Sequence, residues 1–207
     1  YKYSTRYGAL NVNQLLDWNH NFGMHGVHIL LGHETKSDQE KYLYAHMTGF
    51  ADPNNSEFSN ASTYQDLGSY TNEYALEGYF AKGEYDYLDR YYFTASIRRD
   101  GSSKFHKDNR WGSFWSLGGA WIMSKESWFK SSWVDMLKLK ASVGSQGNDN
   151  IGSYRYVDTY GISNSNNLPG TSFENKGNRN ITWETQTNFN AGVEFTLLKR
   201  ISGSIEY

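Results

Sequence analysis

The sequence predicts an all-β protein, an antiparallel sheet with one apolar and one polar side, as in the wall of a membrane-spanning β-barrel. Aromatic residues make up 17% of the 207 residues, although the mean hydropathy is only −0.75. The longest apolar stretch, residues 26–32, is far shorter than the ~20 residues of a membrane helix. A membrane strand needs only ~9–11 residues and averages out as polar, because its side chains alternate.

Alternation of apolar and polar residues marks each expected strand in turn. In residues 91–100, Phe93 and Ile97 fall on one side and Thr94 on the other, which is the pattern of a strand with two different faces. In the first expected strand, Leu15 is out of pattern. We expect eight strands, at residues 12–22, 26–35, 73–85, 91–100, 111–123, 137–144, 183–195 and 200–207.

The connections between these strands alternate in length. Residues 23–25, 86–89 and 198–199 are short links, and residues 124–135 form a link with one expected helical turn that begins near Ser124. The intervening connections are long and polar, at residues 36–72, 101–110 and 145–182. Outer-membrane barrels alternate short periplasmic turns with long extracellular loops, and they carry an aromatic girdle at each interface. Aromatic residues gather near both kinds of connection here, as such girdles require.

No motif of the sequence predicts catalysis. The chain has no cysteine, no HExxH, no nucleophile elbow and no phosphate-binding loop, so we expect neither an enzyme nor a cofactor or metal site. A net charge of −2 also disfavours nucleic acid as a partner. The six histidines are expected to be solvated turn residues, with His28 and His33 on opposite faces, and substrate-binding residues remain unknown.

Four further residues receive a structural interpretation. Asp149 is expected to lie in a loop turn rather than bind calcium, because the EF-hand pattern is absent. Arg98, Arg99 and Lys104 form the only basic cluster. We interpret them as inward-facing charges or as a brace for a loop, and not as a phosphate site.

Two neighbouring blocks carry a resemblance to a known family. They are YFTASIRRDGSSKF at residues 92–105 and NRWGSFWS at residues 109–116, supported by LKLKASVGSQGN at residues 137–148. Further support comes from ITWE at residues 181–184 and FNAGVEF at residues 189–195. With these blocks the chain resembles the SusC/RagA-like TonB-dependent outer-membrane transporters of Bacteroidetes. It differs at Trp115, where family members often carry proline.

The resemblance implies a larger molecule. Residues 1–207 would be part of a single barrel domain, the C-terminal portion of a plugged transmembrane barrel of about 22 strands. The plug domain, TonB box and signal peptide are expected outside this sequence. The resemblance also implies an outer-membrane importer of oligosaccharides or peptides that works with a SusD-like surface lipoprotein and with TonB.

Two other architectures remain open at this point. A complete small barrel of eight strands, with a structural or adhesive role, would pair its first strand with its last. A soluble sandwich acting as a lectin or adhesin would instead pack two sheets face to face.

Overall fold

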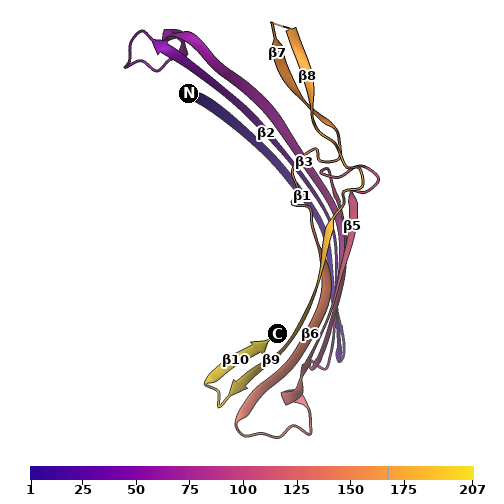
Figure 1. Ribbon diagram of the computed structural model, residues 1–207. Helices are drawn as coiled ribbons and strands as arrows, with labels where there is room; N and C mark the ends of the chain where they lie inside the picture. Colours follow the sequence, from indigo (N-terminus) through magenta and orange to yellow (C-terminus); the bar gives the residue numbers. More distant parts are fainter. Residues whose placement is uncertain (167) are drawn as a thin grey trace.

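The computed structural model describes residues 1–166 and 168–207, and they form mostly β-sheet (Figure 1). Asn167, in the predicted loop 145–182, lies outside the described residues. Two 3₁₀ turns, η1 (Phe58–Asn60) and η2 (Met123–Lys125), lie between strands. No helix in the described part of the chain is long and apolar enough to cross a membrane. The strands are β1 (Lys2–Phe22), β2 (His25–Phe50), β3 (Ala61–Tyr87), β4 (Tyr91–Ser102), β5 (Trp111–Ile122), β6 (Val134–Asn148), β7 (Thr159–Ser165), β8 (Leu168–Asn175), β9 (Glu184–Leu197) and β10 (Ile201–Glu206).

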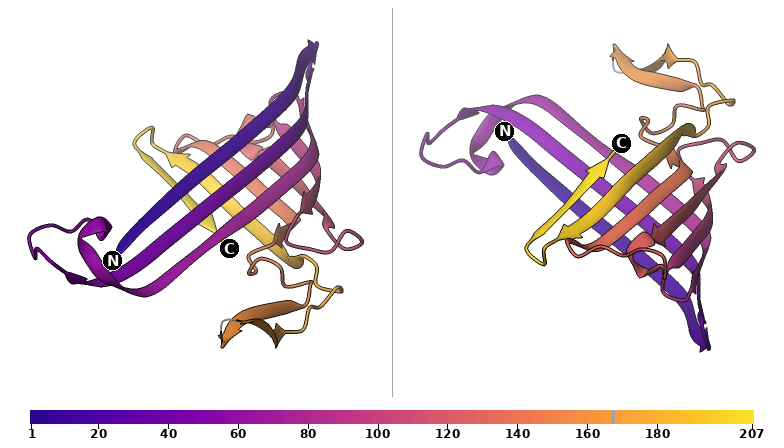
Figure 2. Two further views of the ribbon diagram at one scale, coloured as in Figure 1. Left: turned by 90° about the horizontal axis from the view of Figure 1, so that it is seen from above. Right: turned by 90° about the horizontal axis from the view of Figure 1, so that it is seen from below.

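Eight strands form one antiparallel sheet in the order β1-β2-β3-β4-β5-β6-β9-β10, and β7 and β8 form a separate hairpin. The large sheet is a single curved layer, like a section of a cylinder wall (Figures 1 and 2). β1 and β10 lie at opposite edges, and within the described residues they do not pair. The alternative of a closed eight-stranded barrel is therefore wrong. The sandwich is wrong as well, because in the described part of the chain the only other sheet is the two-stranded β7–β8 hairpin, and it does not cover a face of the large sheet.

The pairing register explains why the sheet has two different faces. Phe93 lies directly opposite Tyr85 on one side and Gly119 on the other, whereas Thr94 lies opposite Glu84 and Gly118. Directly opposed residues share a face of the sheet. The alternation within each strand therefore extends across the strands as rows, and the polar rows line the concave side.

The short links are tight turns at one rim of the sheet. Leu88 and Asp89 have φ of 56° and 51°, and Leu198 and Lys199 have φ of 52° and 54°. Two successive residues with positive φ are typical of the type I′ turns that match the twist of paired strands. The expected helical turn near Ser124 is present as the shorter η2. We call this end of the sheet the short-turn rim and the other end the long-loop rim.

The predicted loop 36–72 is wrong in extent. β2 continues to Phe50 and β3 begins at Ala61, so that only residues 51–60 connect them, and β1 begins at Lys2. These extensions form a three-stranded arm, residues 2–11, 36–50 and 61–75, which projects past the other strands (Figure 2). The predicted loop 145–182 also contains regular structure, the β7–β8 hairpin, with Asn166 at φ 52°.

Candidate functional site

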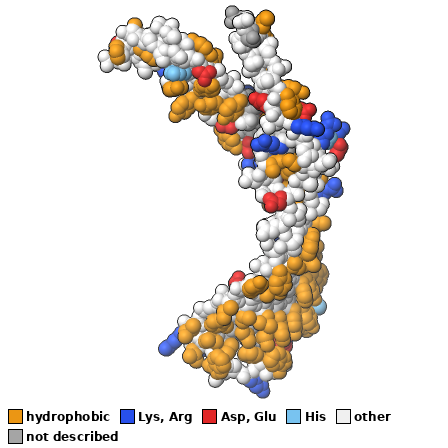
Figure 3. Space-filling model, in the orientation of Figure 1, with side chains coloured by type: hydrophobic (Ala, Val, Ile, Leu, Met, Phe, Trp, Pro, Cys, Tyr) orange, Lys and Arg blue, Asp and Glu red, His pale blue; other side chains and the backbone are white. Residues whose placement is uncertain are grey.

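The convex face carries a continuous band of apolar side chains. Figure 3 shows them gathered over the lower convex side of the sheet. Phe93 and Ile97 are each 58% exposed. Soluble proteins rarely expose apolar patches of this extent, whereas membrane barrels turn them to lipid. Further exposed members of the band are Leu16, Trp18, Ile29, Leu31, Tyr85, Trp115, Leu117, Leu139, Phe189 and Ile205.

Aromatic side chains lie at both ends of this band, as predicted for two girdles. Near the short-turn rim, the ring centroid of Trp121 lies 6.3 Å from that of Tyr91 and 6.2 Å from that of Trp128. Toward the long-loop rim, the guanidinium of Arg99 lies 5.5 Å from the ring centroid of Trp111. Arg99 is thus on the convex face, so its predicted inward position is wrong. A long cationic side chain over an aromatic ring is common at a membrane interface.

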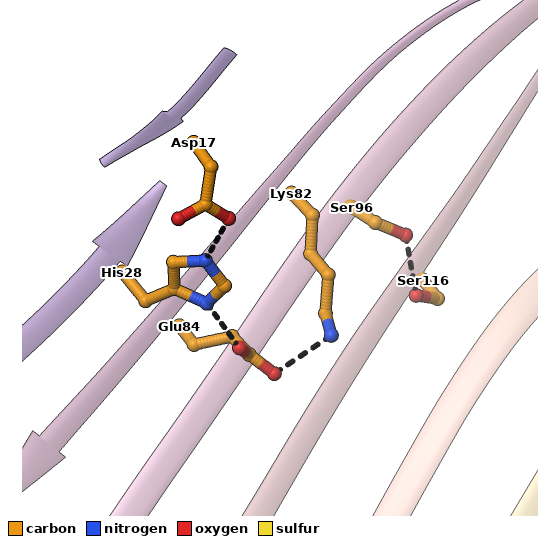
Figure 4. Close-up of polar contacts among 6 residues, drawn as sticks. All are labelled: Asp17, His28, Lys82, Glu84, Ser96 and Ser116. Carbon is orange, nitrogen blue, oxygen red and sulfur yellow. Dashed lines mark hydrogen bonds and ion pairs between the residues drawn. The ribbon is translucent and has the colours of Figure 1, made fainter. Parts of the chain in front are cut away.

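The concave face is polar, and its charges are paired across neighbouring strands. His28 on β2 contacts the carboxylates of Asp17 on β1 and Glu84 on β3, each at 2.7 Å (Figure 4). Lys82 extends this chain with a 2.7 Å ion pair to Glu84. Beside it, the hydroxyl oxygens of Ser96 and Ser116 lie 2.7 Å apart. The sheet therefore presents linked polar groups to its hollow side.

A second chain of ion pairs crosses the concave face of β6, β9 and β10. The Glu194 carboxylate contacts Lys138 at 3.1 Å and Lys140 at 2.7 Å, and Lys140 also contacts Glu206 at 2.6 Å. Lys138, Lys140 and Glu206 border a hollow of about 640 Å³. Its wall is built mainly of small and amide side chains, including Thr94, Ser116, Gly118, Ser142, Asn188 and Asn190.

His28 and His33 both lie within strand β2 and not in a turn. His28 lies on the concave face, whereas His33 lies on the convex face, its ring 4.6 Å from that of Tyr79. The predicted opposite orientation is confirmed, and the predicted solvated turn position is wrong for these two residues. Among the described residues, no group of three or more His, Cys, Asp or Glu could hold a metal ion.

Ion pairs and hydrogen bonds also fix the long-loop rim. Arg98 points inward, with its guanidinium 2.9 Å from Glu34 and 2.7 Å from Asp100, so its predicted orientation is confirmed. Lys104 donates to the backbone carbonyl of Asp149 at 3.1 Å, which confirms the predicted loop brace.

Asp149 joins three segments at the long-loop rim. Its carboxylate accepts hydrogen bonds from the hydroxyls of Tyr74 at 2.9 Å and Ser102 at 2.7 Å. Burial raises the pKa of Tyr74 above its usual range, and the Asp149 carboxylate raises it further. The phenol therefore keeps its proton and acts as a donor. Asp149 lies in a loop, as predicted, but the sequence did not reveal these partners.

An aromatic cluster packs beneath the long loops. Phe105 and Phe114 are almost completely buried, and the Trp183 ring lies 5.5 Å from the first and 5.4 Å from the second. Trp183 also donates its indole N–H to the carbonyl of Arg110 at 2.8 Å. The sequence blocks that carry the family resemblance thus meet in space, although residues 105 and 183 are far apart along the chain.

A curved sheet with an apolar convex face, aromatic girdles and a polar concave face defines a wall segment of a membrane-spanning barrel with a polar lumen. The chain belongs to the TonB-dependent receptor-like β-barrel family, whose sequence model matches residues 1–207. The predicted fold class and family resemblance are both confirmed.

Two TonB-dependent receptors are similar to the chain in sequence. It is 31% identical over 222 residues, covering the whole chain, to TonB-dependent receptor P3 of Formosa agariphila. It is 37% identical over 148 residues, covering 67% of the chain, to TonB-dependent receptor SusC of Bacteroides thetaiotaomicron. The chain spans only 21% of the length of P3 and 15% of that of SusC.

Solved structures share the architecture. One described as the RagAB peptide transporter superposes with a TM-score of 0.94 at 25% identity, over 99% of this chain and 23% of that one. The siderophore receptor PirA of Acinetobacter baumannii matches with a TM-score of 0.55 at 17% identity, which supports the fold alone.

Proposed function

We propose that the chain forms part of the wall of an outer-membrane importer that takes up oligosaccharides or peptides. In this proposal TonB drives the uptake, and a SusD-like surface lipoprotein covers the long-loop rim. The match of the family model to residues 1–207 carries the proposal. The solved structure described as the RagAB peptide transporter supports peptides as cargo, and oligosaccharides follow from the resemblance to the SusC/RagA-like family.

The arrangement of charge on the concave face suits a lumen whose contents change. Glu194 is paired with Lys138 and Lys140, and His28 with Asp17 and Glu84, all within the wall itself. A plug that moves away from this face would therefore leave no unpartnered charge behind among these groups. Unpaired charges in a poorly hydrated site are costly, so pairing within the wall lowers the free-energy cost of plug movement.

The same proposal divides the full-length protein into a barrel, a plug and a TonB-contacting segment. Residues 1–207 belong to one barrel domain, and the plug and the TonB-contacting segment are supplied by other parts of the full-length protein. The long loops held by the hydrogen bonds of Asp149, and the β7–β8 hairpin, lie at the long-loop rim, where the lipoprotein would dock.

Uptake by cells tests the proposal. A strain carrying the full-length gene, a strain lacking it and a strain lacking TonB would each receive fluorescent oligosaccharides and peptides. We expect uptake of one cargo class in the first strain only, and co-purification of a surface lipoprotein with the tagged transporter. Uptake that persists without TonB would contradict the proposal.

A further inference from the structure

The arm contains a strand edge that is open within the described residues. β3 pairs with β2 almost throughout its length, but with β4 only from Leu76 to Tyr87. β4 ends at Ser102, and the chain then turns away through residues 103–110 to β5. Both sequence neighbours of β3 are present, so this open edge does not arise from an end of the chain.

Contacts of Ala75 show which residues face the edge. The Ser103 N–H donates to the carbonyl of Ala75, and the Ala75 N–H donates to the Ser103 hydroxyl, each at 2.9 Å. Alternate residues of a strand direct both backbone groups to the same side. Ser69, Thr71 and Glu73 therefore direct theirs to the open edge, and all three residues are exposed. In the described chain nothing pairs with that side of them.

The open run is limited at both of its ends. At one end the Leu67 N–H donates to the Asp66 carboxylate at 2.9 Å, and at the other end Ser103 binds both the N–H and the carbonyl of Ala75. Natural proteins often protect an open edge with proline or charged side chains, lysine above all. Residues 68–74 contain no proline or lysine, and their only charged residue is Glu73. The edge is therefore competent for pairing over a short and defined length.

The side chains beside this edge offer contacts on the concave side. Tyr70 is 46% exposed and shares that face with Tyr42, whose ring centroid lies 5.1 Å away, and with Tyr74. A strand added beside β3 would place every second side chain against Tyr70 and Tyr74. The arm lies beyond the apolar band, so this position is outside the membrane-spanning part of the wall.

We propose that the open edge of β3 from Ser69 to Glu73 binds an extended segment of a peptide cargo as an added strand. The inference rests on the proposed import function and adds a capture site for peptides on the arm. Backbone N–H and C=O groups at regular spacing pair with another peptide backbone, and alternate side chains supply selectivity. Oligosaccharides lack that regular pattern of donors and acceptors. The short run between two limited ends fits a peptide segment better than the long edge of another sheet.

Proline substitution at the edge tests the proposal. The full-length transporter in detergent would be titrated with a fluorescent, unstructured peptide of about ten uncharged residues. Thr71→Pro removes an N–H that faces the open edge and leaves the β2–β3 ladder intact. We expect it to weaken binding on the order of tenfold, which corresponds to the loss of about one or two hydrogen bonds. Thr71→Val, which keeps the N–H, is the matched control and should bind normally.

Hydrogen exchange on the unaltered transporter gives a second measurement, which holds even if Thr71→Pro fails to assemble. Bound peptide should slow exchange at the amides of Ser69, Thr71 and Glu73. Equal binding by the two variants would overturn the proposal, as would protection of these amides by the purified lipoprotein or by self-association alone. TonB-dependent uptake without edge protection would overturn only the capture site, whereas edge protection without uptake would overturn only import.

Discussion

Single residues acquire their environment from their position in the alternation. Phe93 and Thr94 are adjacent in sequence, yet the first is exposed in the apolar band and the second borders the concave hollow. The same holds on β9, where Val193 is opposite Leu139 of the band and Asn190 borders the hollow. Moving one residue along a strand therefore exchanges a lipid-facing position for a lumen-facing one.

This exchange predicts opposite effects for the same substitution. Phe93→Arg and Val193→Arg should impair assembly of the full-length barrel, because arginine on the lipid face costs ~2–4 kcal/mol near the midplane. Thr94→Arg and Asn190→Arg should be tolerated. The amount of each variant in the outer-membrane fraction, and its SDS resistance before boiling, would measure assembly. Equal assembly of all four variants would show that the faces are assigned wrongly.

The sequence predicted the face of most residues but not that of Arg99. Strict alternation alone places Arg99 with Phe93 and Ile97, and the structure agrees. Charge alone groups Arg99 with the inward-facing Arg98 and so gives the wrong face. At an interface, a long basic side chain follows the alternation and reaches polar surroundings along an aromatic ring, so charge is a poorer guide to its direction than position.

Among whole elements, strands within the apolar band were predictable and their extensions were not. Alternation is visible in a sequence only where one face is apolar and the other polar. In the arm, tyrosines lie beside Glu40 and Asn72 on one face, and Leu43 beside Lys41 on the other. Both faces are mixed, so β2 and β3 resemble polar loops beyond residues 35 and 73. The β7–β8 hairpin is hidden by its Asn/Ser-rich composition for the same reason.

The contacts that hold the long loops were also invisible in the sequence. Asp149 and Tyr74 are 75 residues apart, and no local spacing links them. The family resemblance indicated which blocks matter, but not that Phe105, Phe114 and Trp183 pack together. Such contacts depend on the register of distant strands, which a single sequence does not specify.

The hydrogen bonds of Asp149 to Tyr74 and Ser102 predict a local effect of mutation. Asp149→Ala leaves the hydroxyls of Tyr74 and the fully buried Ser102 without their acceptor, which should destabilise this rim by ~1–3 kcal/mol. Limited proteolysis of the full-length protein should then cut residues 149–183 faster, while the barrel stays assembled. Asp108→Ala is the matched control, because Asp108 is an exposed loop carboxylate whose side chain, among the described residues, pairs only with His106. Equal cleavage of the two variants would contradict a role of Asp149 in fixing the loops.

At the scale of the whole molecule, the open sheet fixes how this segment can exist in a membrane. β1 and β10 each pair on one side only within the described residues, and the layer between them curves without closing. In lipid each unpaired backbone group costs several kcal/mol, which is why membrane sheets close into barrels. The wall segment therefore depends on further strands at both edges for a stable membrane-spanning state.

This dependence predicts the behaviour of residues 1–207 produced alone and refolded into detergent. Because the edges of β1 and β10 lack partners, the segment should not form a compact monomer that resists SDS until boiled, whereas the full-length protein should. Gel mobility with and without boiling, together with light scattering to detect association through the open edges, would measure this. A heat-modifiable monomer at 23.8 kDa would show that β1 and β10 can pair with each other after all. The closed eight-stranded barrel would then be an accessible state of this sequence, and the curvature of the sheet would not be set by a larger ring.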